Sequence, residues 1–150
     1  MALPKPEPRG PKPRKRIPKV RAKGKRREVR RRKERKAKLK DADRMFSRFI
    51  RDRDGNTCRA CGSILAPQCA HIVSRRYRAT RWSPDNAVCL CAKDHLRFTF
   101  NPLAWEAWVE ERFPGRLAEL KMRALAGVAH VDYGEVCASL AAIGIREKTA

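Results

Sequence analysis

The stretch "QCAHIVSRRYRATRWSPDNAVCLC", residues 68–91, is the most informative part of the sequence about its architecture. Its two ends, "QCAHIVSRRY" and "RWSPDNAVCLC", predict two short strands, because β-branched and apolar residues gather there. The intervening "RRYRATR" holds four arginines and predicts a loop. After Cys91 the chain should enter a helix that carries His95. The expected centre is therefore strand, strand, helix.

Helices are predicted on both sides of this centre. In "DADRMFSRFIRDRDG", residues 41–55, four apolar residues recur at helical spacing and Gly55 follows as a stop. Asn101 and Pro102 are a favourable N-cap and first position for a helix over "NPLAWEAWVEERF". "GRLAELKMRALAG" predicts a further helix. Asp132 and Glu135 predict a capping box for a last helix through about residue 143.

Charge is unevenly distributed along the 150 residues, whose formal net charge is +21. Residues 1–40 hold twenty Lys/Arg and three acids, so they carry most of that charge. Six prolines and few apolar residues in 1–20 predict an extended, disordered segment, and residues 22–40 should form a frayed helix at most. We therefore expect two parts: a basic nucleic-acid-binding arm over 1–40, which includes Arg30, Arg31 and Arg32, and a folded domain over 41–150.

Several classes are disfavoured by composition. No apolar run is long enough for a transmembrane helix, the N-terminus lacks the apolar core of a secretory signal, and the arm has no apolar face for a membrane surface. We expect a cytoplasmic protein without a membrane partner. Cysteine thiols stay reduced in that compartment, so six cysteines indicate metal binding before disulfides.

Two cysteine-containing pairs share one internal spacing. Cys58-x-x-Cys61 is followed thirty residues later by Cys91-x-x-Asp94. Two such knuckles form a tetrahedral zinc site, and zinc accepts a carboxylate as well as thiolates. The pattern predicts a structural Zn²⁺ held by three sulfurs and Asp94. Cys69, Cys89 and His95 are rival candidates for the fourth position, while Cys137 and His130 are expected to be structural.

The order His71, Asn86, His95 around these knuckles resembles the HNH (ββα-metal) endonuclease family. "MFSRFIRDRDGNTCRACG", "AHIVSRR", "TRWSPDN" and "LCAKDHLRFTFNP" together resemble the phage recombination endonucleases of the NinG and Ref type. The resemblance covers roughly residues 41–125. It implies an α+β fold: a small zinc-stabilised ββα-metal centre flanked by helices, with a disordered basic N-terminal arm.

The resemblance also implies roles for the site residues. His71 would be the general base, because a neutral imidazole can take a proton from water near pH 7. His95 would bind a catalytic Mg²⁺ or Mn²⁺, and Asn86 would fix the loop that orients His71. The position before the base, where the family often has a metal ligand, is Ala70. Metal affinity without DNA should therefore be weak, with Asp85 a further candidate ligand.

The partner predicted is DNA, with no small-molecule substrate, and the Ref resemblance implies a recombinase filament as a second partner. The loop arginines that would hold phosphates are Arg75, Arg76, Arg78 and Arg81. Trp82, beside this loop, is a better candidate for touching a ligand than Trp105 and Trp108, which should pack on the ribbon. The leading hypothesis is a metal-dependent DNA endonuclease acting in phage recombination or repair, in the cytoplasm of a bacterial host. The alternatives are a non-catalytic zinc module that binds DNA and an RNA- or ribosome-associated basic protein.

Overall fold

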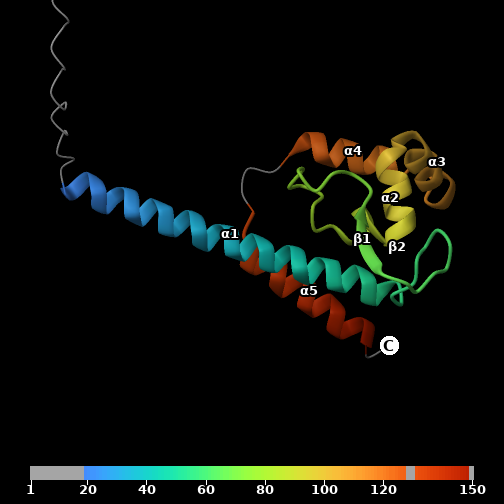
Figure 1. Ribbon diagram of the computed structural model, residues 1–150, viewed down its shortest axis with the longest axis horizontal. Helices are drawn as coiled ribbons and strands as arrows, with labels where there is room; N and C mark the ends of the chain where they lie inside the picture. The colour runs from blue at the N-terminus through green and yellow to red at the C-terminus, as the bar shows by residue number, and fades with distance from the viewer. Residues whose placement is uncertain (1–18, 128–130, 149–150) are drawn as a thin grey trace, which may run out of the picture. The chain divides into compact units, whose positions relative to one another are not determined.

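The computed structural model describes residues 19–127 and 131–148, with side chains over 24–127 and 131–142. The expected disorder of residues 1–18 and the structural role of His130 lie outside that range. The elements, in chain order, are α1 (Lys19–Arg53), β1 (Pro67–His71), a short 3-10 helix η1 (Pro84–Asn86), β2 (Ala87–Cys91), α2 (Ala92–Phe100), α3 (Pro102–Arg112), α4 (Arg116–Ala126) and α5 (Tyr133–Lys148) (Figure 1).

Helix α1 is longer than the sequence predicts. It contains both the expected helix over 41–53 and residues 19–40, for which we expected disorder or fraying. Arg, Lys and Glu have high helix propensity, and elongating an existing helix avoids the cost of nucleation. The chain divides into two compact units, one ending at Arg35 and the other beginning at Lys36, a few residues before the predicted boundary.

The strands β1 and β2 pair antiparallel, with Pro67 opposite Cys91 and His71 opposite Ala87. Side chains alternate between the two faces of this ribbon. Ala70 packs in the core that includes Phe98 of α2. Cys69 packs against the core that includes Phe46 of α1. Every residue of β2 is buried, so both faces of that strand are covered.

The outer edge of β2 is bonded to the end of α1 and to the segment that follows it. Arg53 donates to the carbonyl oxygens of Pro84 (2.6 Å) and Ala87 (2.9 Å). The Asp54 carboxylate accepts from the backbone N–H of Cys89 (2.7 Å), and Arg59 N–H donates to the Cys89 carbonyl (2.9 Å). These bonds fix the ribbon against the α1 terminus.

Three apolar clusters surround the ribbon. In the unit beginning at Lys36, α1 and α5 lie side by side (Figure 1) and share one cluster. The second joins the ribbon to α2 and α3, and the third joins residues after β1 to α3 and α4. Trp105 and Trp108 stack at 5.3 Å within them, and Trp105 Nε1 donates to the Ile72 carbonyl (3.3 Å). Both tryptophans pack on the ribbon, as predicted.

The predicted starts of α3 and α5 agree with those observed. The Asn101 side chain caps α3 by accepting from Ala104 N–H (3.1 Å), and Pro102 begins that helix. Asp132 accepts from the N–H groups of Gly134 (2.7 Å) and Glu135 (3.3 Å) at the start of α5, which continues to Lys148, past the expected end at residue 143. Among the residues described, no helix has the length and apolar character needed to cross a bilayer.

Candidate metal centre and histidine sites

Cys58, Cys61, Cys91 and Asp94 form a cluster in which one ligand atom from each lies within 4.8 Å of the others. A tight turn supplies the first two: Cys58 N–H donates to Ser63 O and Gly62 N–H to Cys58 O, both at 2.8 Å. The junction of β2 and α2 supplies the other two. Two distant segments thus present three sulfurs and one carboxylate to one point.

The distances within this cluster match a tetrahedral site. Metal–sulfur bonds of about 2.3 Å separate tetrahedral sulfurs by about 3.8 Å, and a sulfur and an oxygen by about 3.6 Å. Cys61 Sγ and Cys91 Sγ lie 3.7 Å apart. Asp94 Oδ2 lies 3.3 Å from Cys58 Sγ and 3.5 Å from Cys91 Sγ. The four residues can hold a metal ion with little rearrangement.

The surroundings favour negative charge at Asp94 and Cys58 but disfavour it at Cys61. Asp94 lies in the first turn of α2, where the helix dipole stabilises anions, and Arg97 Nε is 3.6 Å from its Oδ1. Burial disfavours the Cys58 thiolate, but backbone N–H groups of Cys91 and Cys61 point at its sulfur, and the pKa of Cys58 is lowered overall. The hydrogen bond to Asp94 raises the pKa of the Cys61 thiol to about 12. Because a metal binds the thiolate, loading should release protons.

The cluster distinguishes among the four candidates for the fourth ligand. Asp94 is a member, and among the described residues Cys69, Cys89 and His95 are not. Cys69 and Cys89 face each other across the ribbon, and burial raises the pKa of both thiols. His95 Nδ1 instead lies 2.6 Å from Gln68 Oε1.

Asn86 is fully buried and bonds both ends of the loop that follows β1. Its Oδ1 accepts from Val73 N–H (2.7 Å), and its Nδ2 donates to the carbonyl oxygens of Val73 (3.0 Å) and Thr80 (2.9 Å). Its own carbonyl accepts from Ile72 N–H (2.8 Å). The side chain therefore holds the loop closed, which agrees with a positioning role.

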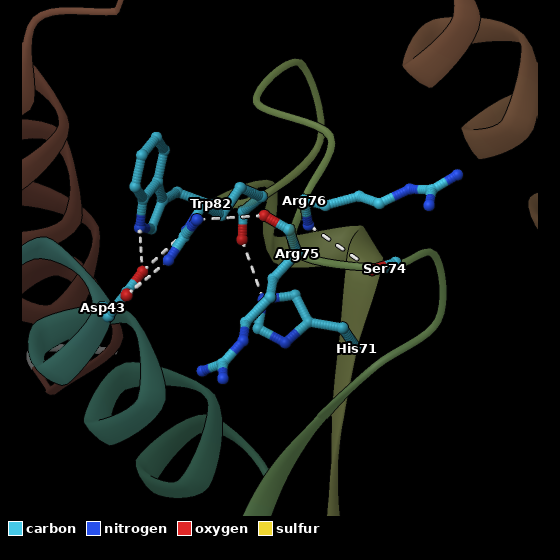
Figure 2. Close-up of polar contacts among 7 residues, drawn as sticks. Asp43, His71, Ser74, Arg75, Arg76 and Trp82 are labelled. Carbon is cyan, nitrogen blue, oxygen red and sulfur yellow. Dashed lines mark hydrogen bonds and ion pairs between the residues drawn. The ribbon is translucent and has the colours of Figure 1, made fainter. Parts of the chain in front are cut away.

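His71 lies at the end of β1 with its ring held on two sides. Nε2 lies 2.9 Å from the Arg81 carbonyl, a contact drawn as a dashed line from the His71 ring in Figure 2. The ring also contacts Phe46 of α1, at 5.4 Å between centroids. A carbonyl oxygen only accepts, so Nε2 carries the proton and a neutral ring has its lone pair on Nδ1. Burial, together with the charges of Arg75 and Arg81, lowers the pKa of His71 below its ordinary value. The ring is therefore neutral at pH 7.

His95 is held differently. Its Nδ1 donates to Gln68 Oε1, which leaves the lone pair on Nε2, and burial lowers the pKa of this ring as well. Gln68 belongs to β1, three residues before His71. A hydrogen bond of this kind orients a metal-binding imidazole. Sequence reasoning missed Gln68, because no motif marks a glutamine twenty-seven residues before the histidine that it orients.

The two histidines have separate surroundings. Gln68 shares the Ala70 face of the ribbon, next to α2, whereas His71 contacts Phe46 of α1. Within the described residues no hydrogen bond or ring contact links His71 to His95, and neither joins the cysteine cluster. Asp85, the further candidate metal ligand, pairs with Arg123 of α4.

The loop arginines fall into two groups. Arg75, Arg76 and Arg78 are exposed, and Arg76 donates to the Tyr77 hydroxyl (2.7 Å). Arg81 is largely buried and donates twice to the Asp43 carboxylate, at 2.9 and 2.6 Å (Figure 2). The first group can meet a phosphate, while the guanidinium of Arg81 already has an acidic partner.

Trp82, the aromatic candidate for touching a ligand, is mostly buried. Its Nε1 donates to Asp43 Oδ1 (3.0 Å), its ring meets Tyr133 of α5 edge-on, and it lines a hollow together with Arg78 and Leu140. An indole whose N–H has a partner can pack in an apolar core. On α1, Arg30, Arg31 and Arg32 are exposed.

Comparisons with protein-family models, with curated proteins and with solved structures found no match. Any functional conclusion therefore depends on the chemistry of the residues described above.

Proposed function

We propose that this chain is a metal-dependent DNA endonuclease of the HNH type, acting in recombination or repair, with a structural Zn²⁺ in the cysteine cluster. One observation carries the catalytic part. Asn86 closes the loop whose Arg81 carbonyl holds Nε2–H of His71. This arrangement leaves a neutral imidazole with Nδ1 as the proton acceptor, which is the state that a general base requires.

Zinc is the metal that fits the donor set best. Three thiolates and one carboxylate at tetrahedral distances suit Zn²⁺, whereas Mg²⁺ and Ca²⁺ prefer oxygen ligands. The cluster links the turn after α1 to the first turn of α2, so the ion would stabilise the fold around the ribbon. All four positions belong to protein side chains, which is typical of a structural rather than a catalytic zinc.

In the proposed hydrolysis, Nδ1 of His71 takes a proton from the attacking water, and Asn86 acts as a positioning residue. The exposed Arg75, Arg76 and Arg78 hold phosphates of the strand. His95, oriented by Gln68, is the side chain that would bind the second divalent ion through Nε2. That ion, Mg²⁺ or Mn²⁺, supplies charge stabilisation at the scissile phosphate.

A second function is favoured by a specific observation. Ala70 offers no ligand, and His71 and His95 have no common contact or metal-binding cluster in the described part of the chain. A zinc module that binds DNA without cutting it would need neither imidazole near a phosphate. It predicts salt-sensitive binding and no cleavage with any divalent cation.

Nicking of supercoiled plasmid separates the two functions. The purified protein with Mg²⁺ or Mn²⁺ should convert supercoiled to open-circular DNA. His71→Ala, purified in the same way, should lose the activity while keeping its zinc content and circular dichroism spectrum. Cleavage by the variant at the rate of the parent would show that His71 is not the base, and absence of cleavage by the parent would favour the non-catalytic module.

A further inference from the structure

The basic part of α1 has charge on every side. Residues 24–35 are all exposed, and eight of the twelve are Lys or Arg: Lys25, Arg26, Arg27, Arg30, Arg31, Arg32, Lys33 and Arg35. Two acids accompany them, and the structure records one ion pair in the segment, Arg30 with Glu34 (3.2 Å, both largely exposed). Exposed pairs of this kind contribute little stability, so most of the positive charge is free to meet a partner.

Helical geometry distributes this charge around the axis. Successive residues turn by about 100°, so the eight basic side chains leave no angular gap wider than about 80°. A helix that lies on a membrane or on another protein needs an apolar stripe. Within 24–35 the one large apolar residue is Val29, which is 54% exposed. The segment therefore matches a partner that presents negative charge on more than one side.

We infer that residues 24–35 of α1 bind in the major groove of B-form duplex DNA, an inference that depends on DNA being the partner proposed above. The groove is about 12 Å wide, which admits a helix about 10–12 Å across, and phosphates line both of its walls. A single strand or a flat anionic surface would meet one side of the helix. Duplex RNA is excluded by its deep, narrow major groove.

The length of the segment is consistent with this site. Twelve helical residues span about 18 Å, alongside about ten phosphates at one charge per 1.7 Å of duplex. Residues 24–35 contain no Asn or Gln, the side chains that read adenine, and their many Lys and Arg can all reach phosphates, so we expect the contacts to be mainly to phosphates. Binding by this segment should therefore be insensitive to sequence and steeply dependent on salt.

Two matched double variants test whether both sides of the helix are used. Arg26→Gln with Lys33→Gln removes two charges from one side, and Arg31→Gln with Arg35→Gln removes two from the side about 170° away. None of these four residues is in a recorded ion pair within the described segment. Gln has nearly the helix propensity of Arg and Lys, so the helix should persist, as circular dichroism will verify.

Binding of the full chain is measured by fluorescence anisotropy at several salt concentrations without added magnesium or manganese, so the outcome is independent of cleavage. The probes are one sequence as duplex DNA, single-stranded DNA and duplex RNA. We expect duplex DNA to bind at least about tenfold more tightly than the other two, and each double variant to reduce the slope of log affinity against log salt by about 1.8. A loss confined to one of the two variants, or equal affinity for single strands or duplex RNA, would overturn the major-groove assignment.

Discussion

Replacing Asn86 by alanine should destabilise the folded domain strongly, because its side chain is the partner of buried backbone groups. The variant removes the recorded partner of Val73 N–H and of Val73 O. The Thr80 carbonyl loses one bond but still accepts from Ser83 N–H at 3.1 Å. Two buried groups are therefore left unpaired, at about 2 kcal/mol each, which gives a loss of about 4 kcal/mol in the free energy of unfolding.

Urea denaturation followed by tryptophan fluorescence, at fixed zinc concentration, measures this loss. With a slope of about 1.3 kcal/mol per molar urea, the midpoint should fall by about 3 M. Thr80→Val is a matched control in the same loop. Thr80 is fully buried and its hydroxyl has no recorded partner, so removing that hydroxyl should be neutral or stabilising. The reasoning fails if Asn86→Ala costs less than about 1 kcal/mol, or if Thr80→Val costs as much as Asn86→Ala.

The other predictions concern catalysis, the metal and the Asp43 contacts. Burial lowers the pKa of His71 below 6.5, so the rate of plasmid nicking should increase with pH along a curve whose midpoint lies below pH 6.5 and should then stay constant through neutral pH. A midpoint above pH 7 would contradict a base that is buried and neutral. Native mass spectrometry should find one zinc ion per chain. The Cys58→Ser variant should lose both the ion and cooperative unfolding. The Asp94→Cys variant should retain zinc, and loss of zinc from this variant would argue against a tetrahedral site. Asp43→Ala should cost about 2–4 kcal/mol, because it removes the carboxylate of the Arg81 ion pair and the recorded partner of the Trp82 indole N–H, and leaves the Arg81 guanidinium only its bond to the Arg75 carbonyl. The exposed Arg75→Ala should change stability by less than about 0.5 kcal/mol, and similar urea midpoints for the two variants would refute this contrast.

The sequence predicted the helices and strands better than it predicted which side chains contact one another. Apolar runs and the Asn101–Pro102 signal located the helices and two strands, because these depend on neighbouring residues. Both strands are shorter than predicted, since β1 ends at His71 and β2 begins at Ala87. Trp82 was a candidate for touching a ligand because it follows Arg81, and the sequence did not predict its hydrogen bond to Asp43, which lies thirty-nine residues away. Pair spacing in the chain predicted Asp94 as the fourth ligand but could not exclude Cys69, Cys89 and His95, since their exclusion depends on how the turn at Cys58 meets the start of α2.

The length of α1 could not be predicted from hydrophobic periodicity either. Its basic part has no apolar stripe, so periodicity offered no reason for a helix before residue 41. The same residues have high intrinsic helix propensity, and they extend a helix whose later turns are held by Phe46 and Ile50 in the core. A helix that is anchored at one end can include residues that would not form one alone.

The bonds along the outer side of β2 have a consequence for how this protein behaves at high concentration. A two-stranded ribbon ordinarily presents free N–H and C=O groups that can recruit a strand from a neighbouring molecule. Here Arg53 occupies the Ala87 carbonyl, and Asp54 and Arg59 occupy the N–H and carbonyl of Cys89. These contacts protect the outer side of β2 against intermolecular β-association, and they come from the residues at and just after the end of α1.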